Sequence, residues 1–258
     1  MPNLGLILFR CDASRSIGTG HVMRCRTLAR ELQKRGGEIL FLCRRQQGDL
    51  LSLLQSEFRV APLPERESET DSSSSDSTTD EANLRSDLTG HGQEQDVADC
   101  LAALNRLGLR QASWLVVDHY SLDIEWERRM IEGLQNNDLL ANRPRLLVLD
   151  DLAIKKHDCD ILLNMCFGAQ YSDYDYLLPS RAQRLIGPTF ALLREEFRLL
   201  RPASLQRRND ENLGRILIAM GGMDVNQLTE PILDALCDIT SSRPFSVAIL
   251  LSSRAPHV

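Results

Sequence analysis

Short apolar runs alternate along the chain with longer segments in which apolar residues recur every three or four positions. Unbroken apolar runs are typical of strands buried on both faces of a parallel sheet, and the segments between them have helical spacing. This order of elements predicts an α/β fold with a Rossmann-like N-terminal domain over residues 1–200. The expected strands are 4–9, 38–43, 58–63, 114–120, 145–150, 160–163 and 184–187, and the expected helices are 22–34, 48–55, 96–107, 124–135 and 190–200.

The same pattern begins again near the end of the chain. A polar segment, 201–214, breaks the periodicity and predicts a domain linker. A strand at 215–220, a glycine-containing turn, a helix at 227–237 and a strand at 245–251 then predict an incomplete Rossmann-like C-terminal domain over 215–258. One such unit cannot close a core by itself. We therefore expect either a fragment of a longer gene product or a truncated protein.

One segment interrupts the pattern. Residues 64–95 are rich in Ser, Thr, Asp and Glu, and they cannot bury enough apolar surface to offset the entropy lost on ordering. The sequence predicts a disordered insertion there, without a catalytic role. The chain has a net charge of −6, and the acidic excess lies in this segment, so the remainder is slightly basic. It has no broad basic patch of the kind that binds nucleic acid, which favours a small-molecule partner.

Other features of the composition narrow the class of protein. No apolar run approaches the length of a membrane span, and the N-terminus shows no secretory signal, so we expect a cytoplasmic protein. The seven cysteines lie mostly in apolar segments and form no Cys-x-x-Cys pair. This predicts buried free thiols rather than disulfides, and no metal site.

The turn after the first strand carries the first candidate chemistry. Gly18 and Gly20 allow a sharp turn and a close approach of the backbone to a ligand. His21 falls in the first turn of the following helix, where unpaired N–H groups favour anions. An imidazole there suits acid–base work on a phosphate-bearing substrate. The pattern is equally compatible with an ordinary turn and a surface histidine, because it completes neither a dinucleotide-binding motif nor a P-loop.

Polar residues also follow two later strands. Asp118, His119 and Tyr120 end the strand at 114–120, and Asp150 and Asp151 end the strand at 145–150. The carboxyl ends of strands border the ligand crevice of open α/β sheets, so these residues are site candidates. The alternatives are structural: Asp118 would cap a turn and Tyr120 would pack its ring. The paired carboxylates are compatible with a metal, with a sugar hydroxyl or with a loop cap.

Six motifs, in order along the chain, resemble one family. They are Arg10-Cys-Asp-Ala-Ser with Ile17-Gly-Thr-Gly-His-Val-Met-Arg24, Val117-Asp-His-Tyr120, Leu149-Asp-Asp-Leu-Ala153, His157-Asp-Cys-Asp-Ile-Leu-Leu-Asn164, Gly187-Pro-Thr-Phe-Ala-Leu-Leu-Arg-Glu-Glu-Phe197 and Ala219-Met-Gly-Gly-Met-Asp224. The chain resembles the UDP-2,4-diacetamido-2,4,6-trideoxy-β-L-altropyranose hydrolases of pseudaminic acid biosynthesis. The acidic insertion is not a hallmark of that family.

The resemblance implies a two-domain GT-B-like fold, similar to the MurG glycosyltransferase. It also implies release of UDP from a UDP-sugar by water attack at the anomeric carbon, with inversion and without a metal or cofactor. His21 is then the expected base, and Tyr120 is expected close to the sugar and the water. The C-terminal domain of the family holds the uridine. The expected substrate-binding residues are Asp12, Gly18, Gly20, Asp118, Asn164, Gly221, Gly222 and Asp224.

Elementary chemistry is consistent with this implication. UDP is a good leaving group, so one base in a positioned pocket suffices, whereas a retaining glycosidase uses two carboxylates about 5 Å apart. Two alternatives remain open. One is a GT-B-like glycosyltransferase, which would use an acceptor sugar in place of water. The other is a truncated, non-catalytic remnant that binds nucleotide sugars.

Overall fold

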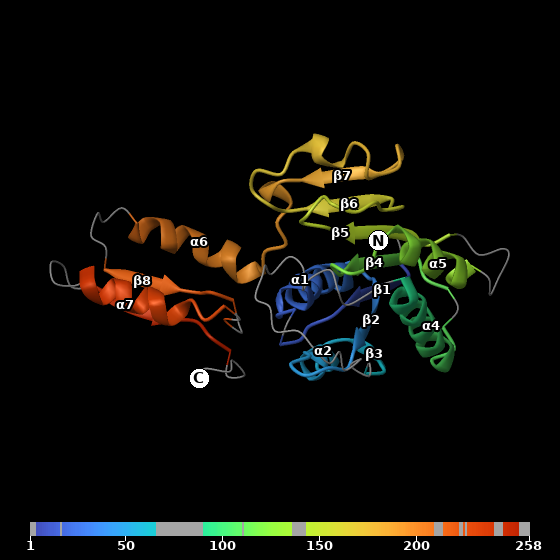
Figure 1. The fold of residues 1–258 in the computed structure, drawn as a ribbon, viewed down its shortest axis with the longest axis horizontal. Coiled ribbons are helices and arrows are strands. Elements are labelled where there is room, and N and C mark those ends of the chain that lie inside the picture. Colours follow the sequence, from blue (N-terminus) through green and yellow to red (C-terminus); the bar gives the residue numbers. More distant parts are fainter. Residues whose placement is uncertain are drawn as a thin grey trace, which may run out of the picture.

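A computed structural model describes most of the chain and contains two separate parallel sheets, one of seven strands and one of two (Figure 1). The prediction of an α/β fold with a parallel N-terminal sheet is confirmed. Among the described residues, none of the helices has the length and apolarity that a membrane span requires. The described residues are 4–15, 17–65, 90–109, 111–135, 143–208, 214–221, 224, 226–239 and 245–252.

The large sheet has the strand order β3-β2-β1-β4-β5-β6-β7, and all its strands are parallel. The chain builds outward from β1 in one direction and, from β4 onward, in the other. Cys11 at the end of β1 lies beside Asp118 at the end of β4. Open α/β sheets bind ligands at such a switch point, outside the carboxyl ends of the strands. The strands are β1 (Leu6–Cys11), β2 (Glu38–Arg44), β3 (Arg59–Leu63), β4 (Trp114–Asp118), β5 (Arg145–Leu149), β6 (Ile161–Asn164) and β7 (Gln183–Ile186).

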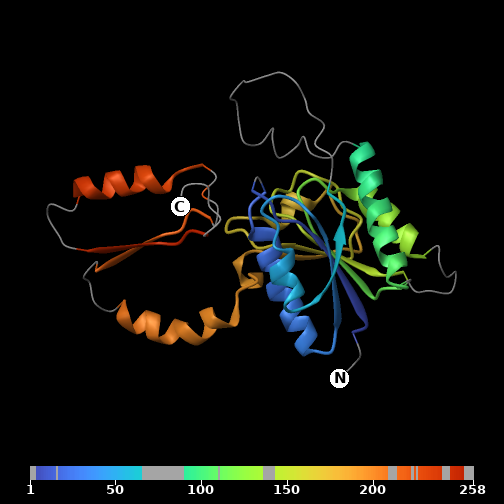
Figure 2. The ribbon, with the colours of Figure 1, turned by 90° about the horizontal axis from the view of Figure 1, so that it is seen from below.

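Helices cover both faces of this sheet (Figure 2). The helices α1 (Gly20–Lys34) and α2 (Leu51–Gln55) lie on one face, and α4 (Gly90–Arg106) and α5 (Ile124–Gln135) lie on the other. Successive strand residues point to opposite faces, so Phe9 packs in the core beneath α1 and Leu8 in the core beneath α4 and α5. Burial on both faces explains the unbroken apolar runs of the strands.

The C-terminal part contains the predicted strand–helix–strand unit. Its elements are α6 (Glu195–Arg207), β8 (Arg215–Ile218), α7 (Thr229–Ile239) and β9 (Ser246–Ile249), and β8 pairs with β9 in parallel. Ile218 is buried, whereas the neighbouring Leu217 is 67% exposed. This small unit therefore buries much less apolar surface per strand than the large sheet does.

The start of α4 differs from the prediction. The helix begins at Gly90 rather than at residue 96, so the last six residues of the predicted insertion are helical. The sequence does not show this helix start, because Gln93 and Asp96 are polar but face inward, where helical periodicity would require apolar side chains. Gln93 donates a hydrogen bond from Nε2 to the carbonyl of Ser121. Residues 66–89 of the insertion lie outside the described residues.

The predicted linker is helical in its first half. After a short 3₁₀ turn at Pro188–Phe190, α6 begins at Glu195 and continues through Pro202 to Arg207. None of its side chains is buried, so the sequence shows no apolar periodicity there. The segment is nevertheless rich in the helix-favouring residues Leu, Ala, Gln and Arg. Residues 209–213 of the linker lie outside the described residues.

All seven cysteines are free, as predicted, and five of them are buried. The expectation of burial is wrong for Cys166 and Cys237, which are exposed. Cys166 follows β6, at the carboxyl edge of the sheet, where the chain leaves the core.

Candidate active site

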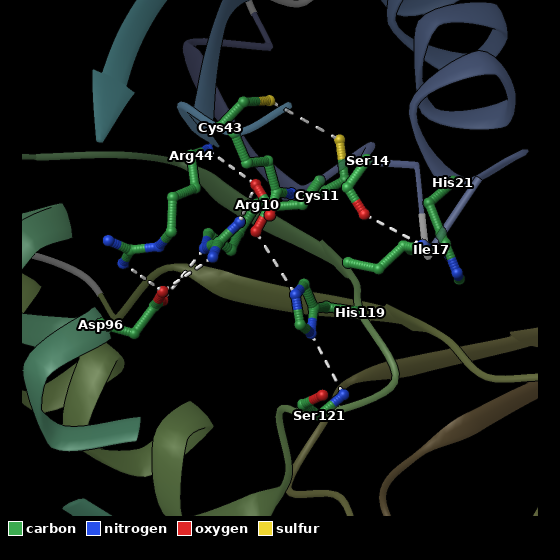
Figure 3. Close-up of polar contacts among 12 residues, drawn as sticks. Arg10, Cys11, Ser14, Ile17, His21, Cys43, Arg44, Asp96, His119 and Ser121 are labelled. Atoms are coloured by element: carbon green, nitrogen blue, oxygen red, sulfur yellow. Dashed lines mark hydrogen bonds and ion pairs between the residues drawn. The ribbon is translucent and has the colours of Figure 1, made fainter. Parts of the chain in front are cut away.

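The turn after β1 places His21 at the switch point of the sheet. Ser14 and Gly18 close this turn, with a backbone hydrogen bond of 2.9 Å from the Gly18 N–H to the Ser14 carbonyl. The Ser14 hydroxyl also accepts the N–H of Ile17 at 2.9 Å (Figure 3). Gly18 has a φ of 80°, which favours glycine, and no neighbouring atom crowds its Cα. Gly20 then begins α1, and His21 occupies its first turn, as the sequence predicts.

His21 is held by Asp118, which ends β4. The Nδ1 atom of His21 lies 2.6 Å from Oδ1 of Asp118, and both side chains are buried. A carboxylate can only accept, so Nδ1 carries a ring proton, and in the neutral imidazole Nε2 is the acceptor. Burial by itself would raise the pKa of Asp118, but hydrogen bonds from Arg24 and His21 outweigh burial and lower that pKa to about 2. The pair is thus an imidazole oriented by an ionised carboxylate.

Arg24 completes this cluster, although sequence reasoning did not select it as a site residue. Its Nε lies 2.5 Å from Oδ2 of Asp118 and its Nη2 lies 2.6 Å from Oδ1. Its Nη1 hydrogen-bonds Asp151, the second residue after β5. The spacing of three residues between His21 and Arg24 on one helix was the available signal, since such residues share a helix face.

Tyr120 lies against the same imidazole. The rings of His21 and Tyr120 are 4.4 Å apart between centroids and nearly perpendicular, at 84°. Burial, and next the negative charge of Asp151, raise the pKa of the Tyr120 hydroxyl, so this group stays protonated at neutral pH. The structure therefore brings together the two predicted catalytic residues, His21 and Tyr120, with Asp118.

Asp12 belongs to a separate buried cluster. Its Oδ1 lies 2.7 Å from Nη1 of Arg10 and accepts the N–H of Arg44 at 2.7 Å. His119 approaches the other oxygen at 3.4 Å with Nε2, while its Nδ1 accepts the N–H of Ser121 at 3.1 Å (Figure 3). The proton of His119 is therefore on Nε2, facing Asp12. Burial opposes ionisation of Asp12, but Arg10 and His119 outweigh it and hold its pKa well below the usual range.

A network of charges lies beneath Asp12. Asp96 of α4, which is fully buried, binds Arg10 through two hydrogen bonds of 3.0 and 2.7 Å and Arg44 through one of 2.6 Å (Figure 3). The indole of Trp126 donates to the same carboxylate at 3.0 Å. This network ties α4 and α5 to the ends of β1 and β2. The network lies next to the candidate site, and Figure 3 shows His21 apart from Asp96, Arg10 and Arg44.

The two adjacent carboxylates after β5 have different partners. Asp150 accepts the N–H groups of Leu152 and Ala153 at 3.1 and 3.0 Å, so it caps the following loop. Asp151 instead faces Arg24. The sequence left open a metal, a sugar hydroxyl or a loop cap as the role of these carboxylates. Asp150 is a loop cap, and Asp151 is part of the cluster around His21.

Asn164 lies at the carboxyl edge of β6 but is bonded to the protein at both ends of its amide. Its Nδ2 donates to the Tyr174 hydroxyl at 3.0 Å, and its Oδ1 accepts the N–H of Cys166 at 2.8 Å. The Tyr174 hydroxyl donates to the Asp150 carbonyl at 2.8 Å. These bonds fix the chain where it leaves the sheet beside Asp150.

The predicted residues of the C-terminal turn lie in the small unit. Asp224 accepts the N–H groups of Leu228 and Thr229 at 3.0 and 3.1 Å and thereby caps α7. Gly221 has a φ of 82°, and Asp224 also lies in the left-handed region, with a φ of 43°. Gly222 lies outside the described residues.

In the described part of the chain, no group of three or more His, Cys, Asp or Glu side chains is arranged to hold a metal ion.

Comparisons with known proteins bear out the resemblance that the motifs carry. The chain is 28% identical over 230 residues to a UDP-2,4-diacetamido-2,4,6-trideoxy-β-L-altropyranose hydrolase of Campylobacter jejuni, covering 89% of the chain and 65% of that relative. It is 24% identical over 155 residues to the uncharacterized protein MJ1062 of Methanocaldococcus jannaschii, covering 49% of the chain and 32% of that protein. No family model matches the chain.

Among solved structures, MurG of Acinetobacter baumannii aligns with a TM-score of 0.47 and 11% identity, over 97% of this chain and 67% of that one. The chain spans 65% of the length of the Campylobacter relative.

Proposed function

We propose that this chain carries the catalytic residues of a UDP-sugar hydrolase, which releases UDP from a UDP-2,4-diacetamido-2,4,6-trideoxy-hexose. The observation that carries the proposal is the pair of His21 and Asp118 at the switch point of the sheet, 2.6 Å apart. The name of the Campylobacter relative, to which 89% of the chain aligns, supports the substrate class. A place in pseudaminic acid biosynthesis is part of the same proposal and rests on the resemblance that the motifs carry.

In the proposed reaction, His21 is the general base. Asp118 holds the proton on Nδ1, so Nε2 takes a proton from water as the water oxygen attacks the anomeric carbon. The bond between that carbon and the oxygen of the β-phosphate breaks, and UDP leaves with the electron pair. Attack from the face opposite UDP inverts the anomeric configuration. Tyr120, whose ring contacts His21, would present its hydroxyl to the sugar or the water.

The diphosphate would lie over the first turn of α1. N–H groups at a helix N-terminus stabilise negative charge, and here they follow Gly18 and Gly20 directly. Charge that develops on the leaving UDP would be stabilised there without a metal or a cofactor. In this proposal Asp12 and Asn164 shape the pocket through the loops that they fix, and Gly221, Gly222 and Asp224 belong to the part that holds the nucleotide.

Turnover of the purified protein with the UDP-sugar tests this proposal. We expect equimolar UDP and free sugar, with label from ¹⁸O-water in the anomeric hydroxyl and with the inverted anomer seen first by NMR. His21→Asn should lower turnover by ~10²–10⁴-fold because the base is lost. Tyr120→Phe tests the tyrosine hydroxyl in the same assay.

Other products would point to the alternatives. If UDP release required an added acceptor sugar and gave a glycoside, the activity would be glycosyl transfer. If the folded protein bound UDP in calorimetry but released none from the UDP-sugar, the remnant would be the better description. Near-wild-type turnover by His21→Asn would remove His21 from the mechanism.

A further inference from the structure

Arg24 is the charged group closest to the pair of His21 and Asp118, and the reaction as written assigns it no role. It makes two hydrogen bonds to Asp118 and one to Asp151, and its side chain is 17% exposed. Resting on the proposed function, we propose that Arg24 is a positioning residue, which clamps Asp118 and keeps the His21 ring neutral with Nε2 free for water.

The clamp follows from the way the two oxygens of Asp118 are shared. Oδ1 receives both the His21 ring and Nη2 of Arg24, at 2.6 Å each, and Oδ2 receives Nε of Arg24 at 2.5 Å. A two-point contact between a planar guanidinium and a carboxylate fixes the plane of the carboxylate. The direction from Oδ1 to the His21 ring is thereby fixed as well. The rotamer of Asp118 alone would not fix it.

Arg24 also connects two strand ends. Asp118 ends β4, and Asp151 is the second residue after β5, the neighbouring strand. Nη1 of Arg24 binds Asp151 while the other two nitrogens bind Asp118. The guanidinium is therefore held from both sides and cannot swing away with a single side chain. A lysine has one point of charge and cannot make this three-nitrogen contact.

The charges around His21 favour the same role for Arg24. The titratable and charged groups that contact the His21 ring are Arg24 from α1 and Asp118 and Tyr120 from the end of β4. Beside these groups lie Cys25 from α1, Asp151 after β5 and Cys166 after β6. Asp118 and Asp151 are carboxylates, which favour a protonated imidazole. Nη2 of Arg24 lies 3.4 Å from Nδ1 of His21 and opposes that protonation. A protonated ring could not accept a proton from water, so Arg24 preserves the base.

Arg24→Gln tests the inference through pH dependence. The variant removes the positive charge, so the ring should bind a proton more readily. We expect kcat at pH 7 to fall by up to ~10-fold, with activity recovered at higher pH because the acidic limb of the pH–rate profile moves up by about one pH unit. Added guanidinium should restore part of the activity of Arg24→Ala, whereas Arg24→Lys should not recover the wild-type rate.

Arg26→Gln is the matched control. Arg26 lies on the same helix, is 13% exposed and binds Glu57, away from the site. Its loss should leave the pH–rate profile unchanged. An equal loss of kcat for Arg24→Gln at every pH, or the same profile shift in Arg26→Gln, would overturn the inference.

A readout without substrate separates this inference from the proposed reaction. In ¹⁵N NMR spectra of the free protein recorded over a range of pH, the second ring nitrogen of His21 should become protonated at a higher pH in Arg24→Gln than in the wild type. Identical ring signals in both proteins overturn the role of Arg24, whatever the substrate. Absence of UDP release by the wild type, with the NMR difference present, overturns the proposed reaction and leaves the role of Arg24 standing.

Discussion

The chain contains two turns that look alike in sequence and differ in what surrounds them. One joins β1 to α1 through Gly18 and Gly20, and the other joins β8 to α7 through Gly221 and Asp224. At the first turn, the ends of β4 and β5 supply Asp118 and Asp151 to the helix that follows. At the second, Asp224 bonds to the first backbone N–H groups of its own helix.

The difference lies in the number of neighbouring strands. β1 is paired on both sides, whereas the described pairing of β8 is with β9 alone. A strand–glycine–helix pattern specifies a turn and a helix N-terminus. Side chains from other strand ends convert such a turn into a cluster of interacting titratable groups. The comparison predicts that charge changes at the first turn alter chemistry, and that changes at the second alter local stability.

Asp118→Asn should have the largest effect on activity. Asp118 accepts hydrogen bonds from His21 and from Arg24, and both are donors. An asparagine must turn its NH₂ toward one of them, so the ring loses its orientation or its tautomer. We expect kcat to fall ~10²–10⁴-fold, as judged from other histidine–carboxylate pairs. Steady-state assays of UDP release measure this.

The control for that change is Asp123→Asn. Asp123 accepts the N–H of Glu125 at 3.0 Å near the start of α5, and asparagine caps as well as aspartate does. Its activity should match the wild type. A comparable loss of activity in both variants would show that negative charge in general, and not the contact with His21, supports turnover.

The next largest effect concerns stability beneath the first turn. Asp96→Asn removes the charge that Arg10 and Arg44 share, and all three side chains are buried. Breaking such a buried network costs ~3–5 kcal/mol because uncompensated charges remain. Urea unfolding of the whole chain should show this loss. Asp99→Asn removes a more exposed partner of Arg44 and should cost clearly less; equal losses would contradict the account of the network.

Sequence reasoning located the first turn because its signals are local. The apolar run of β1, the two glycines and His21 lie within one short stretch. The partner of His21 lies 97 residues further on, and only the strand order places it there. Asp118 and Tyr120 were found because strand ends share one edge of a parallel sheet. Their pairing with His21 and Arg24 required the register of β1 against β4.

Buried charge limited the rest of the prediction. Gln93 and Asp96 occupy inward positions of α4, so the start of that helix looked like part of a polar insertion. Asp12, a predicted substrate-binding residue, faces Arg10 and His119. Polar residues that satisfy one another inside a domain leave no period in the sequence. Their arrangement is determined by contacts between distant segments.

The stability of the large sheet should depend on pH through His157, whereas that of the small unit should not. Burial would lower the pKa of His157, but Asp150 and Glu127 outweigh burial and raise it to about 9. This stability is fully present below about pH 6.5, the unfolded value, and is lost as the pH rises through about 9. The shift corresponds to roughly 3 kcal/mol. Denaturant unfolding between pH 6 and 10 should show this loss in the wild type.

His157→Gln provides the comparison for this prediction. The variant lacks the titrating ring, so its stability should be lower than that of the wild type at pH 6 and should approach it at pH 10. Parallel pH curves for the two proteins would show that the charge on His157 does not contribute to folding. Helix α7, in the small unit, should show no such dependence in hydrogen exchange.

The smallest effect is expected at the second turn. Asp224→Ala removes the cap of α7 and should cost about 1 kcal/mol. Asp224→Gly also removes the cap but suits the φ of 43°, so it should cost less, and Asp224→Asn should be close to neutral. Hydrogen exchange of the α7 amides measures these differences. None of the three should move the pH–rate profile. A shift comparable to that of Arg24→Gln would mean that Asp224 acts on the reacting groups, and the distinction between the two turns would fail.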